Sequence, residues 1–563
     1  MATRRQPKKF VYTAIALTLA IMSGCSPEFH KDDADKEVYN IIDHKWRAGF
    51  GEKANYIVSD SNLADQNEIK ITSYPVAPET MSLAQAVGIA TANSRNYQAR
   101  KENLYLNVLS LTGERYKYAV QWFATVDVGY SKSGESTEDI EAGAEFGARK
   151  TILTPEGIIA SSALKINWSR FLTGDPRITL ASILTADVIV PLLGGGGGKA
   201  DWENLTQAER DVLYGIREFN RFRQTFVVDT INAYYGVLQQ RDTVTNAQNN
   251  YQRVLESQDR LEMEAEAGRR TRIDVDEARQ NVLRAQESVV STRQRYERTL
   301  DDFKFRLAIA TDANIELDQN ELAALKEMGV TEPTFALDEA IETALVSRLD
   351  LANSTDKIDD NLRKAKLAAE GLGPQLNVKA TIEAASPDEE TDFERIRFHE
   401  GDYTVGFDAD LPFDRKNQRN AYRTSLINLE RQKRQYAADV DSVKLEVRDA
   451  YRRLIQTAEQ YRIQDNSLKL ATQRVESNRL LLDAGRVTVR ILLESQDSLV
   501  NAENAVTAAL IEHLNAKLSF YRDVGILHVK PDGMWAQIDT FTGNTKNDRE
   551  RQKSRLIGAE ENL

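Results

Sequence analysis

The sequence predicts a mainly α-helical fold that carries two internal repeats, each with strands suited to a membrane β-barrel and a long coiled-coil helix hairpin. Three observations lead to this fold class. A short motif occurs twice, as AGRRT from Ala267 and as AGRVT from Ala484. Apolar residues around both motifs recur at helical spacing, and segments of about ten residues before them alternate between apolar and polar side chains. Such self-similarity indicates two copies of one structural unit.

The chain begins with a targeting segment rather than a folded element. Four basic residues precede an apolar run from Phe10 to Met22, which is too short to span a bilayer comfortably. The run ends in MSGC, and Cys25 is the only cysteine in the 563 residues. This pattern resembles a bacterial lipoprotein cleavage site, which implies a signal peptide at residues 1–24 and acylation of Cys25. The alternative is an ordinary signal peptide with a chance cysteine.

Charge argues against a nucleic-acid partner. Residues 1–24 contain four basic residues and no acidic one, so their removal changes the formal net charge from −13 to −17. Nucleic acid binding needs clustered Lys and Arg, which this balance disfavours. No later stretch is long and apolar enough for a transmembrane helix, so a mature protein that spans a membrane must do so with strands.

The two copies of the motif belong to a longer repeat. When the chain is aligned with itself at a constant offset of 217 residues, Gly268 aligns with Gly485 and further scattered positions are identical, with no insertion needed. The matched positions include these pairs: Ala233 and Ala450, Tyr234 and Tyr451, Glu277 and Glu494, Val289 and Val506, Phe303 and Phe520, Ile309 and Ile526. A constant offset over this length predicts two copies of one rigid element.

Each copy reads as a helix hairpin, over residues 201–310 and 418–526. Residues 201–266 contain no proline, and about 65 residues at ~1.5 Å rise form a rod of nearly 100 Å. Such a rod must lie against other rods, and the heptad-like apolar period is typical of coiled coils. The AGR motif is then the reversal between two antiparallel helices, with Gly268 and Gly485 suited to left-handed caps and Asp274 to the next helix start. Whether these glycines do more than cap stays open at this point.

Strands are predicted at about residues 121–192 and 375–412. The segments WFATVDVGY, TLASILTADVIV, QLNVKATIEA and DYTVGFDADL each place apolar side chains on one face and polar ones on the other. Alternation over about ten residues is typical of a barrel with lipid outside and water inside. A soluble sheet with one wet face is the alternative. Four clear strands are too few to close a barrel with a lumen, so we expect several copies to share one.

A second offset places shorter helices before each strand region. The segment from Leu83 matches the segment from Leu337 at an offset of 254, so the first copy has 37 more residues between its helical parts. Most of them fall in residues 131–178, where an extra hairpin turning at TPEG (154–157) is a further possibility. The predicted organisation is a signal peptide (1–24), a lipidated extension (25–80), a first repeat (81–325), a second repeat (326–530) and a polar tail (531–563).

No active site is evident. In LLGGGGGKA a phosphate-binding loop fails twice, because Leu193 stands where the first glycine is needed and Ala200 stands where Ser or Thr must follow the lysine. The five histidines form no metal-ligand spacing, and no nucleophile elbow occurs. We therefore expect no enzyme activity, no cofactor and no metal.

The ordered, doubled set of features resembles the TolC-like outer-membrane efflux family. The features are the AGR.T tips, the Asp-Val that follows the first tip, the proline-containing strand ends VPLLGG and LPFDRKN, and the duplicated LAQAVGIATANS segment. The resemblance covers about residues 80–530. It implies a homotrimer in which four strands of each chain form a shared barrel in the outer membrane, while the helices form a periplasmic tunnel.

The same resemblance implies a function and sites. The tunnel would be the passive exit duct of a tripartite efflux or type I secretion system, driven by an inner-membrane transporter through a periplasmic adaptor. The tips would dock the adaptor, through Gly268, Arg269, Thr271, Gly485, Arg486 and Thr488. Asp274, Arg490 and Glu494 would line the constriction at the closed inner end. The family often places two carboxylates just past the second tip, but Ile491 occupies one of these positions and only Glu494 is acidic.

Two other classes of protein remain possible from the sequence. One is a periplasmic coiled-coil scaffold or adaptor lipoprotein, in which the strands form a soluble sheet. The other is an enzyme on a helical scaffold, for which no residues are apparent. Recovery in the soluble fraction without detergent would favour the scaffold.

Overall fold

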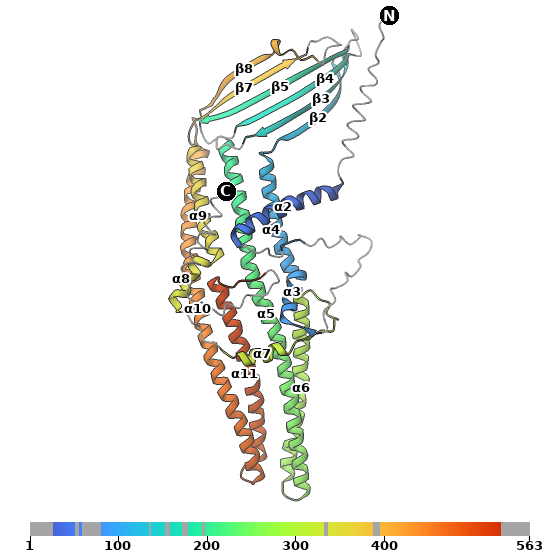
Figure 1. Cartoon of the computed structure of the whole chain (residues 1–563), viewed down its shortest axis with the longest axis vertical. Coiled ribbons are helices and arrows are strands. Elements are labelled where there is room, and N and C mark those ends of the chain that lie inside the picture. The colour runs from blue at the N-terminus through green and yellow to red at the C-terminus, as the bar shows by residue number, and fades with distance from the viewer. Residues whose placement is uncertain are drawn as a thin grey trace. The chain divides into compact units, whose positions relative to one another are not determined.

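The protein is described by a computed structural model (Figure 1) that covers residues 26–50, 56–58, 80–133, 137–152, 158–171, 178–193, 197–330, 336–386, 395–411 and 413–530. Cys25, the signal peptide and the polar tail therefore lie outside the described residues. The chain divides into two compact units, one formed by 1–51, 105–213 and 367–419 and the other by the remaining residues. Within the described part, no helix is both long and apolar enough to cross a membrane.

The first unit contains a sheet of six antiparallel strands in the order β2-β3-β4-β5-β7-β8. The strands are β2 (Gln121–Ser133), β3 (Thr137–Thr151), β4 (Ile159–Phe171), β5 (Ile178–Leu193), β7 (Gln375–Ala385) and β8 (Asp402–Asp410). All four predicted strands are present. The structure adds β3 and β4, which pair with each other and separate β2 from β5. The predicted turn at 154–157 lies outside the described residues.

The sheet has one apolar face and one polar face. The register places Val126 opposite Ala144, and Val378 opposite Phe407, so apolar residues of neighbouring strands share a face. Several of them are exposed in the single chain: Trp122, Val126, Val128, Tyr130, Phe146, Tyr403, Val405 and Phe407. Alternating side chains point to opposite faces of a strand, so the intervening polar residues line the other face.

Helix α2 (Pro27–Phe50) belongs to the same unit and packs on its helical part. Val38, Ile42 and Trp46 are fully buried. Tyr105 donates a hydrogen bond to Asp35 at 2.7 Å, and Lys45 lies 2.7 Å from Glu209. The extension predicted at residues 25–80 thus contains an ordered amphipathic helix over 27–50.

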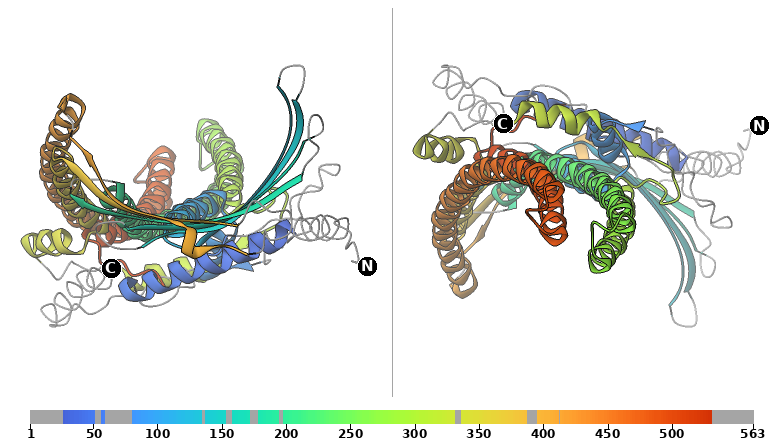
Figure 2. Two further views of the ribbon diagram at one scale, coloured as in Figure 1. Left: turned by 90° about the horizontal axis from the view of Figure 1, so that it is seen from above. Right: turned by 90° about the horizontal axis from the view of Figure 1, so that it is seen from below.

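The second unit is built on two long hairpins. Helix α5 (Gly197–Glu266) is followed by α6 (Arg272–Arg306), and α10 (Lys416–Asp483) by α11 (Val489–Val524). The helices lie where the sequence predicts them. Ion pairs join α6 to α5 through Arg279 and Glu262, and α10 to α11 through Arg453 and Glu512. The view from below (Figure 2, right) shows the two hairpins as neighbours, one green and the other orange to red.

Shorter helices repeat in the same way. Helices α3 (Leu83–Asn93) and α8 (Leu337–Ser347) each have 11 residues, and α4 (Arg95–Tyr116) and α9 (Leu349–Glu370) each have 22. Helix α7 (Asn320–Met328) and a two-strand parallel pair, β1 (Thr80–Met81) and β6 (Glu316–Leu317), complete this unit. A short 3-10 turn, Phe398–Glu400, precedes β8 in the first unit.

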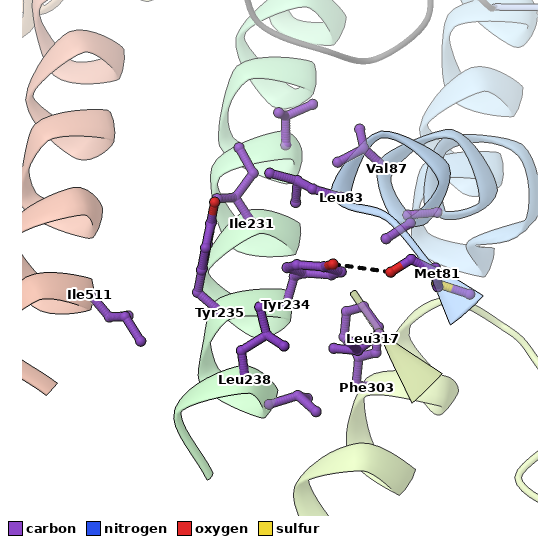
Figure 3. Packing of buried hydrophobic residues seen from close by; sticks show 14 of the residues in the cluster. Met81, Leu83, Val87, Ile231, Tyr234, Tyr235, Leu238, Phe303, Leu317 and Ile511 are labelled. Atoms are coloured by element: carbon purple, nitrogen blue, oxygen red, sulfur yellow. Dashed lines mark hydrogen bonds between the residues drawn. The ribbon is translucent and has the colours of Figure 1, made fainter. Parts of the chain in front are cut away.

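The main core of the second unit gathers around Tyr234 (Figure 3). Its hydroxyl donates to the carbonyl oxygen of Met81 at 3.0 Å, and its ring lies 6.1 Å from that of Phe303. The equivalent positions of the second copy, Tyr451 and Phe520, lie 6.0 Å apart between ring centroids. The offset of 217 residues therefore corresponds to the same contact in both hairpins.

Candidate functional site at the hairpin tips

The two predicted tips are helix-ending turns of the same geometry. Gly268 and Gly485 adopt φ values of +76° and +71°, which confirms the left-handed caps expected from the sequence. In the first turn, the amide of Arg269 donates to the carbonyl of Glu264 at 2.8 Å. In the second, the amide of Arg486 donates to the carbonyl of Leu481, also at 2.8 Å. These bonds satisfy carbonyls that a helix end otherwise leaves unpaired.

Both tips are open at the glycines. A Cβ built on Gly268 or Gly485 would meet no atom within 4 Å, so each turn has free space beside its backbone. Arg269 and Arg486 are exposed. A bulky residue at either glycine would therefore be strained by its φ and not by crowding within the chain.

The helices that follow the tips start differently. Thr271 and Asp274 form a capping box, in which the amide of Asp274 donates to the Thr271 hydroxyl at 3.3 Å and the amide of Thr271 to the Asp274 carboxylate at 3.2 Å. Thr488 has the same extended backbone but makes no side-chain cap. Ile491, which stands where Asp274 stands in the first copy, has no carboxylate to complete a capping box. Asp274, predicted at a constriction, is thus engaged at its own helix start.

The charged residues just past the tips meet across the hairpins. Arg490 of α11 lies 2.6 Å from the carboxylate of Glu277 of α6, and this contact raises the pKa of Arg490. Glu494 is exposed one turn further along, and its charge raises the same pKa to a smaller extent. The structure therefore brings Arg490 together with Glu277, a residue that the sequence did not single out.

Arg270 is the second residue that sequence reasoning missed. Its Nε donates to Glu264 at 2.7 Å, and its Nη2 donates to the carbonyl oxygen of Leu482 at 2.7 Å, at the last turn of α10. A cation is favoured at a helix C-terminus, where unpaired carbonyls concentrate negative charge. The one signal in the sequence is that Val487, and not a second arginine, stands at the equivalent position of the other copy.

An apolar cluster supports the tips from behind. Leu261 of α5, Ala278 of α6 and Leu482 of α10 are buried together with the first turns of α11, at Val489, Leu492 and Leu493. All four long helices contribute to it. The two turns are therefore held in one packed body, and the exposed glycines and arginines project from it.

Part of the chain matches a known protein family. Residues 340–525 match the family model described as outer membrane efflux protein. The match covers about a third of the chain and supports the resemblance of its second repeat to the TolC-like outer membrane efflux family. No curated protein matches the chain in sequence.

Solved structures share the fold of this chain at low sequence identity. CusC is 12% identical with a TM-score of 0.57, and the match covers 79% of this chain and 92% of CusC. The CmeC outer membrane channel of Campylobacter jejuni is 13% identical with a TM-score of 0.57, over 84% of this chain and 89% of CmeC. The MtrE outer membrane channel of Neisseria gonorrhoeae is 13% identical with a TM-score of 0.56, over 80% and 90% respectively.

Proposed function

We propose that three copies of this chain form the exit duct of a tripartite efflux or type I secretion system in the outer membrane. The observation that carries the proposal is the six-strand sheet with one exposed apolar face. Water disfavours so much exposed apolar surface, whereas lipid accommodates it. The opposite face, which holds Asp127, Lys379 and Asp408, suits an aqueous lumen.

Assembly into a trimer is supported by open surfaces on the chain. Strands β2 and β8 are the two edges of the sheet, and unpaired edges favour pairing with another copy. Helix α10 also carries exposed apolar residues along its length: Ile427, Leu445, Ile455, Ile463, Leu470 and Leu480. Neighbouring copies would cover both kinds of surface and close a barrel of strands above a tunnel of helices.

The tips would dock a periplasmic adaptor that connects the duct to an inner-membrane transporter. Open space beside Gly268 and Gly485 allows close approach of a partner backbone. Arg269 and Arg486 are exposed donors suited to its carbonyls or carboxylates. Thr271 and Thr488 would set the turn geometry from which these groups project.

The constriction of the duct would be formed just past the tips, by Asp274, Arg490 and Glu494. Three copies of Glu494 around a narrow axis repel one another, and neighbouring arginines offset that repulsion. The contact of Arg490 with Glu277 places one such cation beside α6. We infer that this pairing helps to hold the inner end closed.

The amino end would be anchored in the outer membrane by acylation of Cys25, with the helices in the periplasm. Helix α2 begins at Pro27, two residues after this cysteine. Cys25→Ser should abolish fatty-acid labelling, and labelling that persists would show the lipoprotein assignment to be wrong.

Oligomeric state tests the function most directly. The protein extracted in detergent should scatter light as a trimer and should need detergent for extraction. A stable monomer would contradict the shared duct. Recovery in the soluble fraction without detergent would favour the periplasmic scaffold instead.

A further inference from the structure

The hairpin β3–β4 is continuous with the sheet on both sides. Strand β2 pairs with β3 from Gln121, opposite Arg149, to Ser133, opposite Thr137. Strand β4 pairs with β5 from Ile159, opposite Ile189, to Arg170, opposite Ile178. Neither strand connects directly to a helix, whereas β2, β5, β7 and β8 each do. The hairpin is thus an insertion into the sheet and not an appendage at its edge.

The chemistry of the hairpin matches that of the other strands on both faces. Ala144 and Phe146 of β3 continue the apolar face of β2, and Leu164 and Ile166 of β4 carry it to β5. The alternate positions are polar or small: Glu141, Gly143, Glu145, Gly147, Lys165 and Asn167. A hairpin that stands in water has no reason to keep an apolar face in register with a membrane strand.

Cross-strand packing shows that β2 and β3 are fitted to each other. On the polar face, a Cβ on Gly143 would lie 2.5 Å from the Asp127 carboxylate, so only glycine leaves that side chain its place. A Cβ on Gly147 would likewise collide with the ring of Phe123 and with the carbonyl oxygen of Ser162. On the apolar face, the rings of Trp122 and Phe146 stack at 5.7 Å. Aromatic residues over strand glycines are a known means of fixing register.

We propose that the β3–β4 hairpin lies in the wall of the shared barrel, so that each copy supplies six strands and three copies close a barrel of eighteen. This inference rests on the trimeric duct proposed above. Four strands per copy, the number predicted from the sequence, would give three copies a barrel of only twelve strands. Barrel diameter grows about linearly with strand number, so the lumen would be wider by about one half.

The circumferences of the barrel and of the helical tunnel support eighteen strands rather than twelve. Strands about 4.8 Å apart and tilted by about 35–45° give eighteen strands a circumference of roughly 105–120 Å, and twelve strands roughly 70–80 Å. Four helices of each chain, α4, α5, α9 and α10, connect to the strands. Twelve such helices packed about 8–10 Å apart occupy roughly 100–120 Å. Eighteen strands therefore match the helices at ordinary tilt.

A wide barrel changes which solutes the duct admits. At ordinary tilt the outer opening would be no narrower than the tunnel, so the inner end alone would limit the size of the cargo.

Single-cysteine variants test the position of the hairpin in membrane-embedded protein. Glu145→Cys and Phe146→Cys probe the two faces of β3, and Asp408→Cys and Phe407→Cys are matched controls on β8. An impermeant maleimide should label Glu145→Cys at least about tenfold faster than Phe146→Cys, because a thiol in apolar surroundings has a raised pKa and little access to the reagent. The wild-type protein reports any background from Cys25.

The controls separate two failures. Equal labelling at 145 and 146, with alternation preserved at 407 and 408, would place the hairpin in water and overturn the eighteen-strand barrel, while the duct itself would stand. Equal labelling at all four positions would overturn the membrane barrel and the duct with it. Alternation at both pairs supports both proposals.

Discussion

The two hairpin tips share one backbone and differ in their side chains. Gly268 and Gly485 have nearly the same φ, and the cap hydrogen bonds of the two turns agree in pattern and length. The first tip nevertheless has a capping box and a cross-hairpin arginine, which the second lacks. The backbone turn is thus common to both copies. The first tip adds a link to the other hairpin from within the turn and a capped helix start, whereas the second copy links the hairpins only past its turn, through Arg490 and Glu277.

Replacement of the glycines should have the largest effect on export, and the effect should be the same at both tips. Leucine at either position costs of order 1 kcal/mol, because φ is positive, and a long helical trimer should tolerate that cost. Gly268→Leu and Gly485→Leu should therefore give normal amounts of membrane-inserted trimer but lose export and crosslinking to the adaptor.

The matched control is Gly113→Leu, at an exposed position within α4 where no positive φ is required and no atom crowds a Cβ. It should keep both trimer and export. Parallel loss of trimer and export in the tip variants would mean that the glycines are structural only.

Removal of the cross-hairpin link should affect the second tip through a residue of the first. Arg270→Ala deletes a charged hydrogen bond worth about 1.5–3 kcal/mol to the end of α10. Amide exchange at Gly485 and Arg486 should become at least about tenfold faster, since 1.4 kcal/mol corresponds to a factor of ten. Arg279→Ala is a control, because its exposed pair with Glu262 lies within the first hairpin, and it should leave exchange at Gly485 and Arg486 unchanged. Unaltered exchange in Arg270→Ala would show that the link carries no energy.

Loss of Glu494 should alter the channel without altering the fold. Glu494 is exposed, so Glu494→Ala should leave trimer yield unchanged and shift the single-channel conductance or cation preference in planar bilayers. Glu512→Ala is a control on the same helix. Glu512 pairs with Arg453 of α10, and both residues are far along the sequence from the tips. No change in Glu494→Ala would place that carboxylate outside the aqueous path.

The smallest effect should come from the helix starts. Thr271→Ala removes an N-cap worth about 1 kcal/mol, whereas Thr488→Ala removes none. Ile491→Asp should create the missing capping box and slow proteolysis at the second tip. Equal effects of the two threonine changes would show that the hydrogen-bonding difference has no energetic weight.

The sequence predicted the features that are written locally and failed on those that depend on distant partners. Gly268, Thr271 and Asp274 are neighbours in the chain, so a cap and a capping box follow from their order. Arg270 reaches a carbonyl 212 residues away, and no local pattern indicates that. The Arg490–Glu277 contact likewise joins α11 to α6 across 213 residues.

The extra strands were ambiguous for a different reason. The apolar face of β3 is made largely of Ala142, Ala144 and Ala148, whose small side chains give a weak alternating signal. Gly143 and Gly147 on the other face lower strand propensity when read alone. Their role is visible only once Asp127 and Phe123 of the neighbouring strand lie over them.

One carbonyl oxygen, that of Leu482, accepts hydrogen bonds from both Gly485 of its own turn and Arg270 of the other. A ligand that displaces either donor changes the free energy of the hydrogen bond that the other donor makes to this oxygen. By thermodynamic reciprocity, occupation of one tip must then alter the affinity of the other by the same factor in both directions. The two turns would bind a partner as one cooperative unit, and Arg270→Ala would weaken the coupling between them.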